Sequence, residues 1–455
     1  MMRAVLALSF ALLACGSEKK TGDDDGSADA SVEADAMPDA FVPTCDPDAD
    51  PYGRCVGDML ATCTAGVPGT IDCTGMGKVC AWQDDTVGYA CVDLANQFLV
   101  SGTVSYEDKP PMNDGSLGPI APHPARGARV SVVLDQGSTV LASATVADDG
   151  TYRLRYTTTA GDMVHIMASA QSPLPARPVT VQTRQKGVHG FGGTSFAAAA
   201  ATTSDVLVTD ASGKSEAFNI LDQLVGTMDK IRVVLGDATP VPLTAQWAVG
   251  STDGTYYDQG AIHLLGQASD DDGYDDTVIL HESGHYVEDT QGRSDSPGGS
   301  HDGSPTDPRL AWSEGFSTYW GMVVRGAPHY MDSNANGGWG YDADTTVTAA
   351  AMPAGTMSQD VSEDMVTEDL WDLGDGKPND DDGVDDGHAA VLRVQVDYLK
   401  PGVFRNVGVT GVDLVDALDG WFIKVGLPPC AEARGIITTT RTFPYDYAGP
   451  AGACP

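Results

Sequence analysis

The chain has 455 residues, of which 42% are hydrophobic, so it is long enough for several domains. Its 64 acidic residues outnumber 26 basic ones, which gives a formal charge of −38 and a pI near 4.2. A surface this acidic argues against electrostatic binding to nucleic acid or to anionic lipid, and we expect neither partner.

The chain begins like an exported protein. Arg3 precedes an apolar stretch that ends at Ala14 and is too short to span a bilayer, so residues 1–14 are typical of a signal peptide. Residues 12–16, Leu-Leu-Ala-Cys-Gly, resemble the lipobox of bacterial lipoproteins, which implies cleavage before Cys15 and lipid attachment to its thiol. The alternative is an ordinary secretory signal with a coincidental cysteine.

A polar segment follows the expected lipid anchor. Residues 15–44 are rich in acids and small side chains and predict a disordered tether. No later segment is long and apolar enough to span a membrane, so the lipid would be the only anchor. The expected location is therefore the outer membrane or cell surface of a bacterium.

Eight cysteines follow Cys15, and six of them fall within residues 45–96. These six are Cys45, Cys55, Cys63, Cys73, Cys80 and Cys91. So many cysteines with few large apolar residues predict a three-disulfide module, whose pairing is one of fifteen. No C-x-x-C spacing occurs among them, which argues against a zinc knuckle. We expect Cys430 and Cys454 to pair and hold the C-terminal tail.

A small antiparallel β-sandwich is expected over residues 97–170. Hydrophobic and polar residues alternate at 130–134 and 152–156, as in half-buried strands. Arg-Gly-Ala-Arg-Val at 126–130, with Ala-Asp-Asp-Gly-Thr-Tyr at 147–152, resembles the carboxypeptidase regulatory-like fold of secreted enzymes. The resemblance implies a binding module or a spacer, and we expect a spacer because nothing in it carries chemistry.

The chain then changes character. Residues 171–213 are expected to form a linker or further strands, and residues 214–455 a domain with both helices and strands. Apolar residues at helical spacing predict an amphipathic helix over 215–235. Strands are predicted at 244–249 and 261–265. The second is either a sheet edge that pairs with an extended peptide or an ordinary strand.

The most informative motif is His281-Glu282-Ser283-Gly284-His285. Residues four apart on a helix lie one above the other, so both imidazoles can reach one metal ion. Glu282 then stands beside the open position, where a general base for water is needed. H-E-x-x-H on a helix is typical of a metalloprotease. Gly284 costs roughly 1 kcal/mol of helix propensity relative to alanine, and close approach of another helix is our hypothesis for it.

A second helix is predicted to begin at Asp307-Pro308 and to carry Glu314. Two histidines and a glutamate form the ligand set of a thermolysin-type zinc site. HESGH together with W-S-E-G-F-S-T-Y resembles the gluzincin peptidases, the group of thermolysin, fungalysin and bacterial collagenase. The resemblance implies an α+β zincin-like fold, zinc held by His281, His285 and Glu314, Glu282 as the base, and a peptide or protein substrate.

One position departs from this family. Many relatives carry an acidic residue four positions after the ligand glutamate, where it orients a histidine ligand, whereas this chain has Thr318. Other zinc classes fit less well, because the metzincin extension would need glycine and histidine at Glu288 and Gln291. His301 and Asp302 are alternative ligands, but they lie in a loop where we expect solvated side chains.

Two further features carry open alternatives. His388 and Tyr319 are candidates for polarising the scissile carbonyl, or else a histidine that caps its own helix and a packed aromatic residue. The acidic loops at 270–276 and 379–386 suit structural calcium, or else are solvated turns.

The sequence therefore predicts a multidomain protein: a disulfide-rich module, an antiparallel β-sandwich and an α+β zincin-like metallopeptidase domain. The expected function is zinc-dependent hydrolysis of peptide bonds at the bacterial surface. Two alternatives stay open. One is a non-catalytic adhesion or scaffold lipoprotein with a structural or decayed zinc site, and the other is a zinc hydrolase of cell-wall peptides. Nothing in the sequence indicates the oligomeric state.

Overall fold

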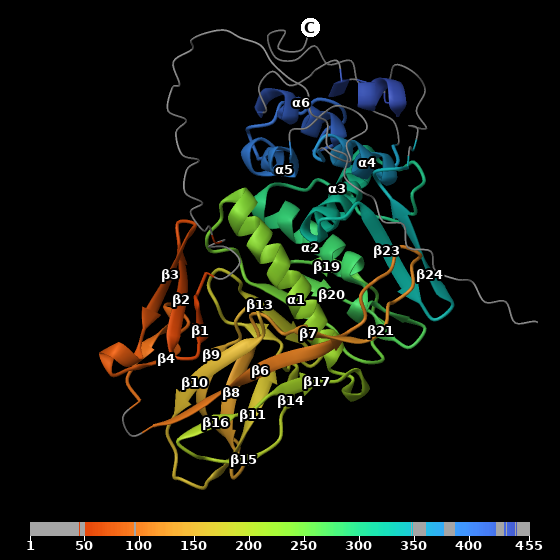
Figure 1. Cartoon of the computed structure of the whole chain (residues 1–455). Helices are drawn as coiled ribbons and strands as arrows, with labels where there is room; N and C mark the ends of the chain where they lie inside the picture. The colour runs from red at the N-terminus through yellow and green to blue at the C-terminus, as the bar shows by residue number, and fades with distance from the viewer. Residues whose placement is uncertain are drawn as a thin grey trace, which may run out of the picture. The chain divides into compact units, whose positions relative to one another are not determined.

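The computed structural model describes residues 45, 51–94, 97–346, 348, 361–376, 387–424, 432–433, 435–441 and 443, all within one compact unit that begins at Thr44 (Figure 1). The expected signal peptide, Cys15 and the tether lie outside the described residues. So do Cys430, Cys454 and the acidic loop at 379–386. Among the described helices, none has the length and apolarity that crossing a membrane requires.

Three disulfides hold the N-terminal region, which confirms the expectation of disulfides there. The pairs are Cys45–Cys63, Cys55–Cys80 and Cys73–Cys91. The second and third pairs link a three-stranded sheet to a hairpin, and the first ties Cys45 to the sheet. The strands are β1 (Arg54–Val56), β2 (Met59–Thr64) and β3 (Val67–Asp72) in the sheet, and β4 (Val79–Asp84) and β5 (Gly88–Val92) in the hairpin. Disulfides suit so short a segment, because it buries few large side chains of its own.

A β-rich domain follows, built from two five-stranded sheets. The first contains β6 (Phe98–Asp108), β7 (Ala121–Pro124), β10 (Thr151–Tyr156), β16 (Ala201–Thr203) and β17 (Val206–Val208). The second contains β8 (Arg129–Leu134), β9 (Thr139–Thr145), β11 (Met163–Ser169), β14 (Gly190–Gly192) and β15 (Phe196–Ala197). The alternating residues Val130, Val132, Tyr152, Leu154 and Tyr156 are buried in its core, as the sequence pattern predicts.

This domain differs from a purely antiparallel sandwich. Both β16 and β17 run parallel to β6, while the other pairs are antiparallel. These two strands come from residues 171–213, so this segment supplies further strands to the sheets.

A third five-stranded sheet crosses the expected domain boundary at residue 213. Its strands, in order, are β12 (Gln171–Ser172), β13 (Val179–Gln182), β18 (Leu243–Gln246), β20 (Ala261–His263) and β19 (Tyr256–Asp258). Of the two alternatives for the strand near residue 261, the structure shows the ordinary strand and not the sheet edge. It pairs with β18 on one side and with β19 on the other, so β19 is the edge strand.

Helix α1 (Ser215–Lys230) continues as a π-helical turn over Ile231–Leu235, which confirms the predicted helix. It contacts β13 and the next helix. Two arginines tie it to the β-rich domain. Arg177 lies 2.6 Å from Asp148 of that domain and 2.7 Å from Asp229 of α1, and Arg126 pairs with Asp222 of α1.

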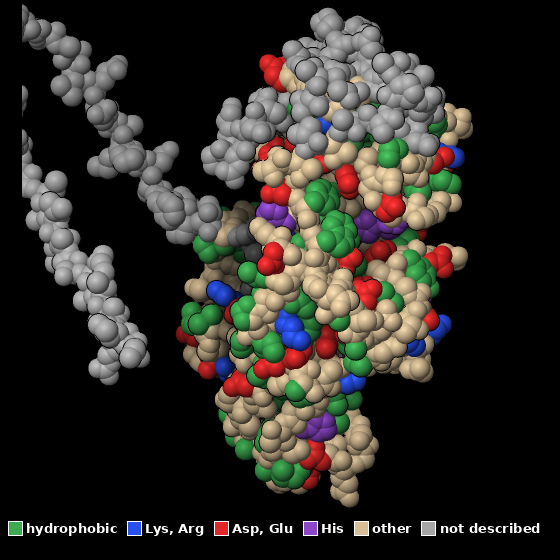
Figure 2. Space-filling model, turned by 90° about the vertical axis from the view of Figure 1, so that its right-hand side faces the viewer, with side chains coloured by type: hydrophobic (Ala, Val, Ile, Leu, Met, Phe, Trp, Pro, Cys, Tyr) green, Lys and Arg blue, Asp and Glu red, His purple; other side chains and the backbone are tan. Residues whose placement is uncertain are grey.

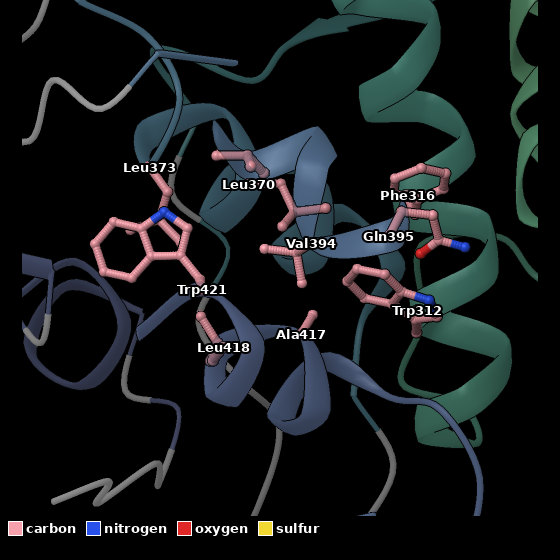
Figure 3. Close-up of a pocket in the computed structure, with 10 residues that line it drawn as sticks. Trp312, Phe316, Leu370, Leu373, Val394, Gln395, Ala417, Leu418 and Trp421 are labelled. Carbon is pink, nitrogen blue, oxygen red and sulfur yellow. The ribbon is translucent and has the colours of Figure 1, made fainter. Parts of the chain in front are cut away.

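The remaining described part is mainly helical. Its helices are α2 (Asp276–Gln291), α3 (Pro308–Arg325), α4 (Glu363–Asp372), α5 (Gly387–Asp397) and α6 (Leu414–Lys424), with a π-helical turn at Gly435–Thr440. Asp307 caps α3 by accepting a hydrogen bond from the Arg309 amide at 3.0 Å, and Pro308 follows it, as predicted. Side chains of α3 to α6 enclose a small apolar cavity that includes Trp312, Phe316 and Trp421 (Figure 3).

Two hairpins complete this region. They are β21 (Gly266–Gln267) with β22 (Asp270–Asp271), and β23 (His329–Asn334) with β24 (Gly337–Asp342). The β23–β24 hairpin contacts the β-rich domain closely. The backbones of Gly115 and Gly338 touch so tightly that a Cβ on Gly115 would lie 2.5 Å from the Gly338 carbonyl carbon, and Asn113 Nδ2 lies 3.1 Å from His329 Nε2.

Candidate metal centre

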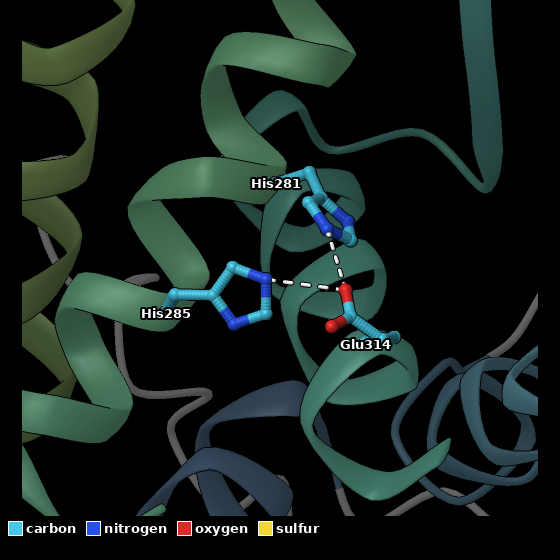
Figure 4. Close-up of side chains that lie close together, drawn as sticks. All are labelled: His281, His285 and Glu314. Carbon is cyan, nitrogen blue, oxygen red and sulfur yellow. Dashed lines mark hydrogen bonds and ion pairs between the residues drawn. The ribbon is translucent and has the colours of Figure 1, made fainter. Parts of the chain in front are cut away.

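Helices α2 and α3 bring the three expected ligands together. The Nε2 atoms of His281 and His285 each lie 3.2 Å from the same oxygen, Oε2 of Glu314 (Figure 4). One ligand atom from each residue lies within 4.8 Å of the others. The two histidines come from successive turns of α2, and Glu314 faces them from α3, as the motif spacing predicts.

Gly284 explains how the two helices approach so closely. A Cβ at this position would lie 2.8 Å from Cβ and 2.9 Å from Oγ of Ser317 on α3. Any side chain there would push α3 away and carry Glu314 with it. The contact supports our hypothesis that this glycine allows the glutamate-bearing helix to come near.

The Nδ1 atoms of both histidines also have hydrogen-bond partners. His281 Nδ1 lies 2.9 Å from Thr318 Oγ1, and His285 Nδ1 lies 3.0 Å from Ser317 Oγ. Each hydroxyl fixes the orientation of its ring, so that Nε2 faces Glu314. Thr318 therefore makes the contact for which the family resemblance in the sequence implied a carboxylate.

A buried carboxylate, which sequence reasoning missed, stands behind His285. Glu288 is fully buried, with its Oε2 3.6 Å from His285 Nδ1. Ser313 Oγ donates a 2.5 Å hydrogen bond to the same oxygen. The spacing could have revealed it, because a residue three positions after His285 lies on the same face of the helix.

Burial and neighbouring charges shift the pKa values of both glutamates in the cluster. Burial raises the pKa of Glu282 above its usual range. Burial also acts to raise the pKa of Glu314, but hydrogen bonds and charges from His281 and His285 outweigh it and hold that pKa well below the usual range. Glu314 is thus an anion facing two imidazoles.

These residues fit a zinc ion. Two imidazole nitrogens and one carboxylate form the ligand set of catalytic zinc sites. Both Nε2 atoms converge on one point while both Nδ1 atoms are engaged elsewhere, as ligand histidines require. Glu282 lies beside them, and its buried Oε2 has no hydrogen-bond partner among the described residues. An orphaned buried carboxylate oxygen is the group expected of a base awaiting water.

The cluster lies in a cleft. One cavity of about 610 Å³ is lined by His281 and Glu282, and a second of about 480 Å³ is lined by Glu282, His285 and Glu314. Glu282 and His301 line both cavities, which therefore meet at the proposed base. On the face shown in Figure 2, histidine and acidic side chains lie close together near mid-height.

His301 lies closer to the cluster than expected of a solvated loop residue. Its Nε2 is 3.6 Å from Glu314 Oε2, and its Nδ1 is 3.2 Å from Glu363 of α4. Its ring stacks on that of His281, with centroids 6.4 Å apart. The side chain remains 40% exposed, so it borders the cleft. Its neighbour Asp302 is exposed and bonds to Ser304 within the loop, as expected.

Tyr319 and His388 are brought to each other and not to the cluster. The Tyr319 hydroxyl lies 3.1 Å from His388 Nδ1, and both rings pack on Trp371. Neither residue lines the two cavities. Tyr330 of β23 does line the larger one, with its ring 6.1 Å from that of His281. No sequence signal pointed to Tyr330, because it reaches the cleft only through the hairpin.

The first of the two acidic loops, residues 270–276, also contributes side chains to the cleft. Asp270 and Asp272 converge with Asp332 of β23, with one oxygen from each within 4.8 Å of the others. Sequence reasoning named the loop but missed Asp332. Asp275 is the N-cap residue of α2, but its side chain makes no capping hydrogen bond. It accepts hydrogen bonds from the Ser333 amide at 2.9 Å and hydroxyl at 2.7 Å.

Comparison with known proteins addresses the same segment. Residues 236–401 match the family described as "Mycolysin C-terminal domain". This match is a metallopeptidase-family link. It spans the helices that carry His281, Glu282, His285 and Glu314.

The other comparisons add little. No curated protein matches the chain. Among solved structures, the chain is similar to the major plantain pollen allergen Pla l 1, at 16% identity and a TM-score of 0.15. The match covers 25% of this chain and 91% of that one. A TM-score this low carries no argument about fold or function.

Proposed function

We propose that the protein is a zinc-dependent endopeptidase. The observation that carries this proposal is the convergence of His281, His285 and Glu314 at one point, with the orphaned carboxylate of Glu282 beside them in a large cleft. The metallopeptidase-family link over residues 236–401 supports it.

The chain's own residues have clear tasks in this proposal. A bound zinc ion supplies Lewis acidity, which lowers the pKa of a water toward neutrality and polarises the carbonyl. Glu282 accepts the proton of the attacking water and then delivers it to the leaving amine nitrogen. Its burial, which raises its pKa, suits a group that must hold a proton between these two steps.

The cleft offers a path for an extended peptide. The two cavities meet at Glu282, so a chain that crosses both brings a peptide bond to the base. Residues of the edge strand β19 line the smaller cavity. An edge strand presents unpaired backbone groups with which a substrate pairs by strand addition. We propose peptide or protein substrates for this reason.

Zinc content and casein hydrolysis test the proposal, measured on the chain from Thr44 onward and on its Glu282→Gln variant. We expect one zinc per chain in both proteins, and a loss of hydrolysis of about 10²–10⁴-fold in the variant alone. The variant keeps the size and shape of the side chain but removes its charge and its basicity.

The other outcomes select between the alternatives. Zinc in both proteins, with no casein hydrolysis in either, would direct the search to other substrates such as cell-wall peptides, or to a structural zinc site. Absence of zinc from both would contradict the proposal and leave a surface adhesion or scaffold protein. The contact of Thr318 with His281 counts against a decayed site, because the ring orientation is maintained.

We also propose that the protein is an exported bacterial lipoprotein, held at the outer membrane or cell surface through Cys15. Three disulfides support an oxidising compartment. Labelling with a radioactive fatty acid tests the anchor. We expect incorporation into the full chain and none into a Cys15→Ser variant. Equal labelling of both would contradict it.

A further inference from the structure

Three carboxylates converge on one wall of the cleft. Asp270 and Asp272 come from the β22 hairpin and the turn that follows it, and Asp332 comes from β23. Their nearest oxygens all lie within 4.8 Å of one another. All three line the larger cavity, together with His281 and Glu282. Two segments distant in the sequence thus present negative charge to the same space as the proposed base.

The fold places the side chains of Asp270 and Asp272 along the larger cavity. Asp271, between the two loop residues, points away and accepts a 3.0 Å hydrogen bond from the Trp247 indole. Asp272 is only 3% exposed and accepts a hydrogen bond from the Thr255 hydroxyl. Burial raises the pKa of Asp272 to about 7, so its charge costs free energy, and a cation in the cavity would offset this cost.

Aromatic rings stand beside the carboxylates. Tyr330 and Trp339 of the β23–β24 hairpin line the same cavity, and their ring centroids are 5.4 Å apart. No lysine or arginine occurs among the residues that line either cavity. Carboxylates and aromatic faces together suit an organic cation, which gains from ion pairing and from contact with the rings.

An independent feature marks this space as a binding site. Glu282 is more than nine-tenths buried, lines the same cavity, and has an Oε2 atom without a hydrogen-bond partner among the described residues. A buried polar atom left without a partner indicates that a ligand completes the site. The three aspartates therefore border ligand space and are not simply a solvated acidic surface.

We propose that this wall of the cleft binds the side chain of a lysine or arginine in the substrate, so that the protein selects cationic peptides. The inference rests on the proposed peptidase function and names its substrate class. Calcium is the competing ligand. Calcium takes six to eight oxygens and gains nothing from aromatic faces, whereas this site joins three carboxylates to two rings. These features favour an organic cation.

Matched peptides test the proposal on the full chain. Arginine is placed at each position of a fluorogenic peptide in turn, and every peptide has a twin with citrulline, which keeps the shape of arginine without its charge. We measure kcat/KM for both twins with the wild-type protein, and their Kd with zinc-loaded Glu282→Gln. We expect at least one position at which arginine is preferred by about tenfold or more in both measurements.

Variants then locate the preference. In Asp332→Asn the ratio of arginine to citrulline should fall about tenfold, and Asp270→Asn is a second variant in case the first misfolds. Asp149→Asn is the control, because it removes the same charge from an exposed turn of the β-rich domain. It should leave the ratio unchanged, which separates a local pocket from the general attraction of an acidic protein.

The outcomes separate this inference from the proposed function. Hydrolysis without an arginine preference would overturn the inference and leave the peptidase standing. A binding preference that depends on Asp332, without hydrolysis of any peptide, would support the inference while the proposed function fails. Neither hydrolysis nor preference would overturn both. Stoichiometric calcium binding by calorimetry that Asp332→Asn abolishes would overturn the inference in favour of a calcium site.

Discussion

Thr318 shows how a single residue can change while its contact is kept. Its hydroxyl lies 2.9 Å from His281 Nδ1, where the family resemblance in the sequence implied a carboxylate. A hydroxyl fixes the ring but adds no negative charge, so the basicity of the ligand rises less. Glu288 supplies a buried carboxylate on the other side, near His285. The two histidines are thus supported unequally.

We expect Thr318→Val to weaken zinc binding by about 10–100-fold, because His281 loses the partner that fixes its orientation. Valine keeps the shape of threonine, so packing is preserved. Competition with a chromophoric chelator measures the affinity. The matched control is Thr290→Val on the same α2 helix as His281, where the hydroxyl bonds to the Tyr286 carbonyl and touches no ligand. Equal affinities of the two variants would contradict a role for Thr318.

At the scale of the elements, the start of α2 is tied to the β23–β24 hairpin. Asp275 accepts two hydrogen bonds from Ser333 and is 1% exposed. Burial raises its pKa to about 8, with further contributions from Asp272 and Asp332. The Asp275 carboxyl therefore titrates at the contact between α2, which carries the two histidines, and the β23–β24 hairpin, which lines the cleft.

This carboxyl makes stability depend on pH. The unfolded chain releases the Asp275 proton near pH 4, while the folded chain keeps it until about pH 8. The native state binds more protons between these values, so this contribution is complete below about pH 4 and is lost as the pH rises to about 8. The loss is on the order of a few kcal/mol.

Urea unfolding at pH 5 and pH 8 measures this effect. The wild-type free energy of unfolding should fall between the two values more than that of Asp275→Asn, which cannot titrate. Asp149→Asn, in an exposed turn, should behave as the wild type. Parallel pH dependence in the wild type and Asp275→Asn would rule out a raised pKa.

At the scale of the whole molecule, the β-rich domain and the α/β region are built together. Strand β13 pairs with β18 of the later region, so one sheet contains strands from both sides of residue 213. Arg177, 2% exposed, bridges Asp148 and Asp229 across the same junction. The β-rich domain is therefore a structural partner of the α/β region and more than a spacer.

We expect Arg177→Met to lower the free energy of unfolding by about 1–3 kcal/mol, because it removes Arg177 from the half-buried Asp148 carboxylate while Asp229 keeps its contacts with Arg126 and Arg232. Arg54→Met is the control, since its ion pair with Asp149 is exposed and should contribute about 1 kcal/mol or less. Urea denaturation measures both. A loss below 1 kcal/mol in Arg177→Met would show that the junction does not depend on this bridge.

The sequence predicts best the helices and the buried strand positions that depend on local periodicity. The helices that carry His281, His285 and Glu314 follow from residue spacing, and the burial of Val130 and Tyr152 follows from alternation. The three N-terminal disulfides follow from the number of cysteines, although their pairing does not.

What the sequence could not predict depends on contacts between distant segments. Tyr330 and Asp332 reach the cleft only because the β23–β24 hairpin folds over α2, and His301 only because its loop returns toward α4. The edge position of β19 depends on the order of strands in space. Local pattern carries no information on such pairings, which tertiary packing decides.

The contact between Gly115 and Gly338 has an evolutionary consequence. A backbone of the β-rich domain touches the hairpin that carries Tyr330 and Trp339, with no room for a side chain at either glycine. Recombination that exchanged one of these segments alone would open the cleft or create a clash. We expect the two to be inherited as a block, so that chains lacking the β-rich domain also differ in the hairpin and, under the proposed function, in the peptides they accept.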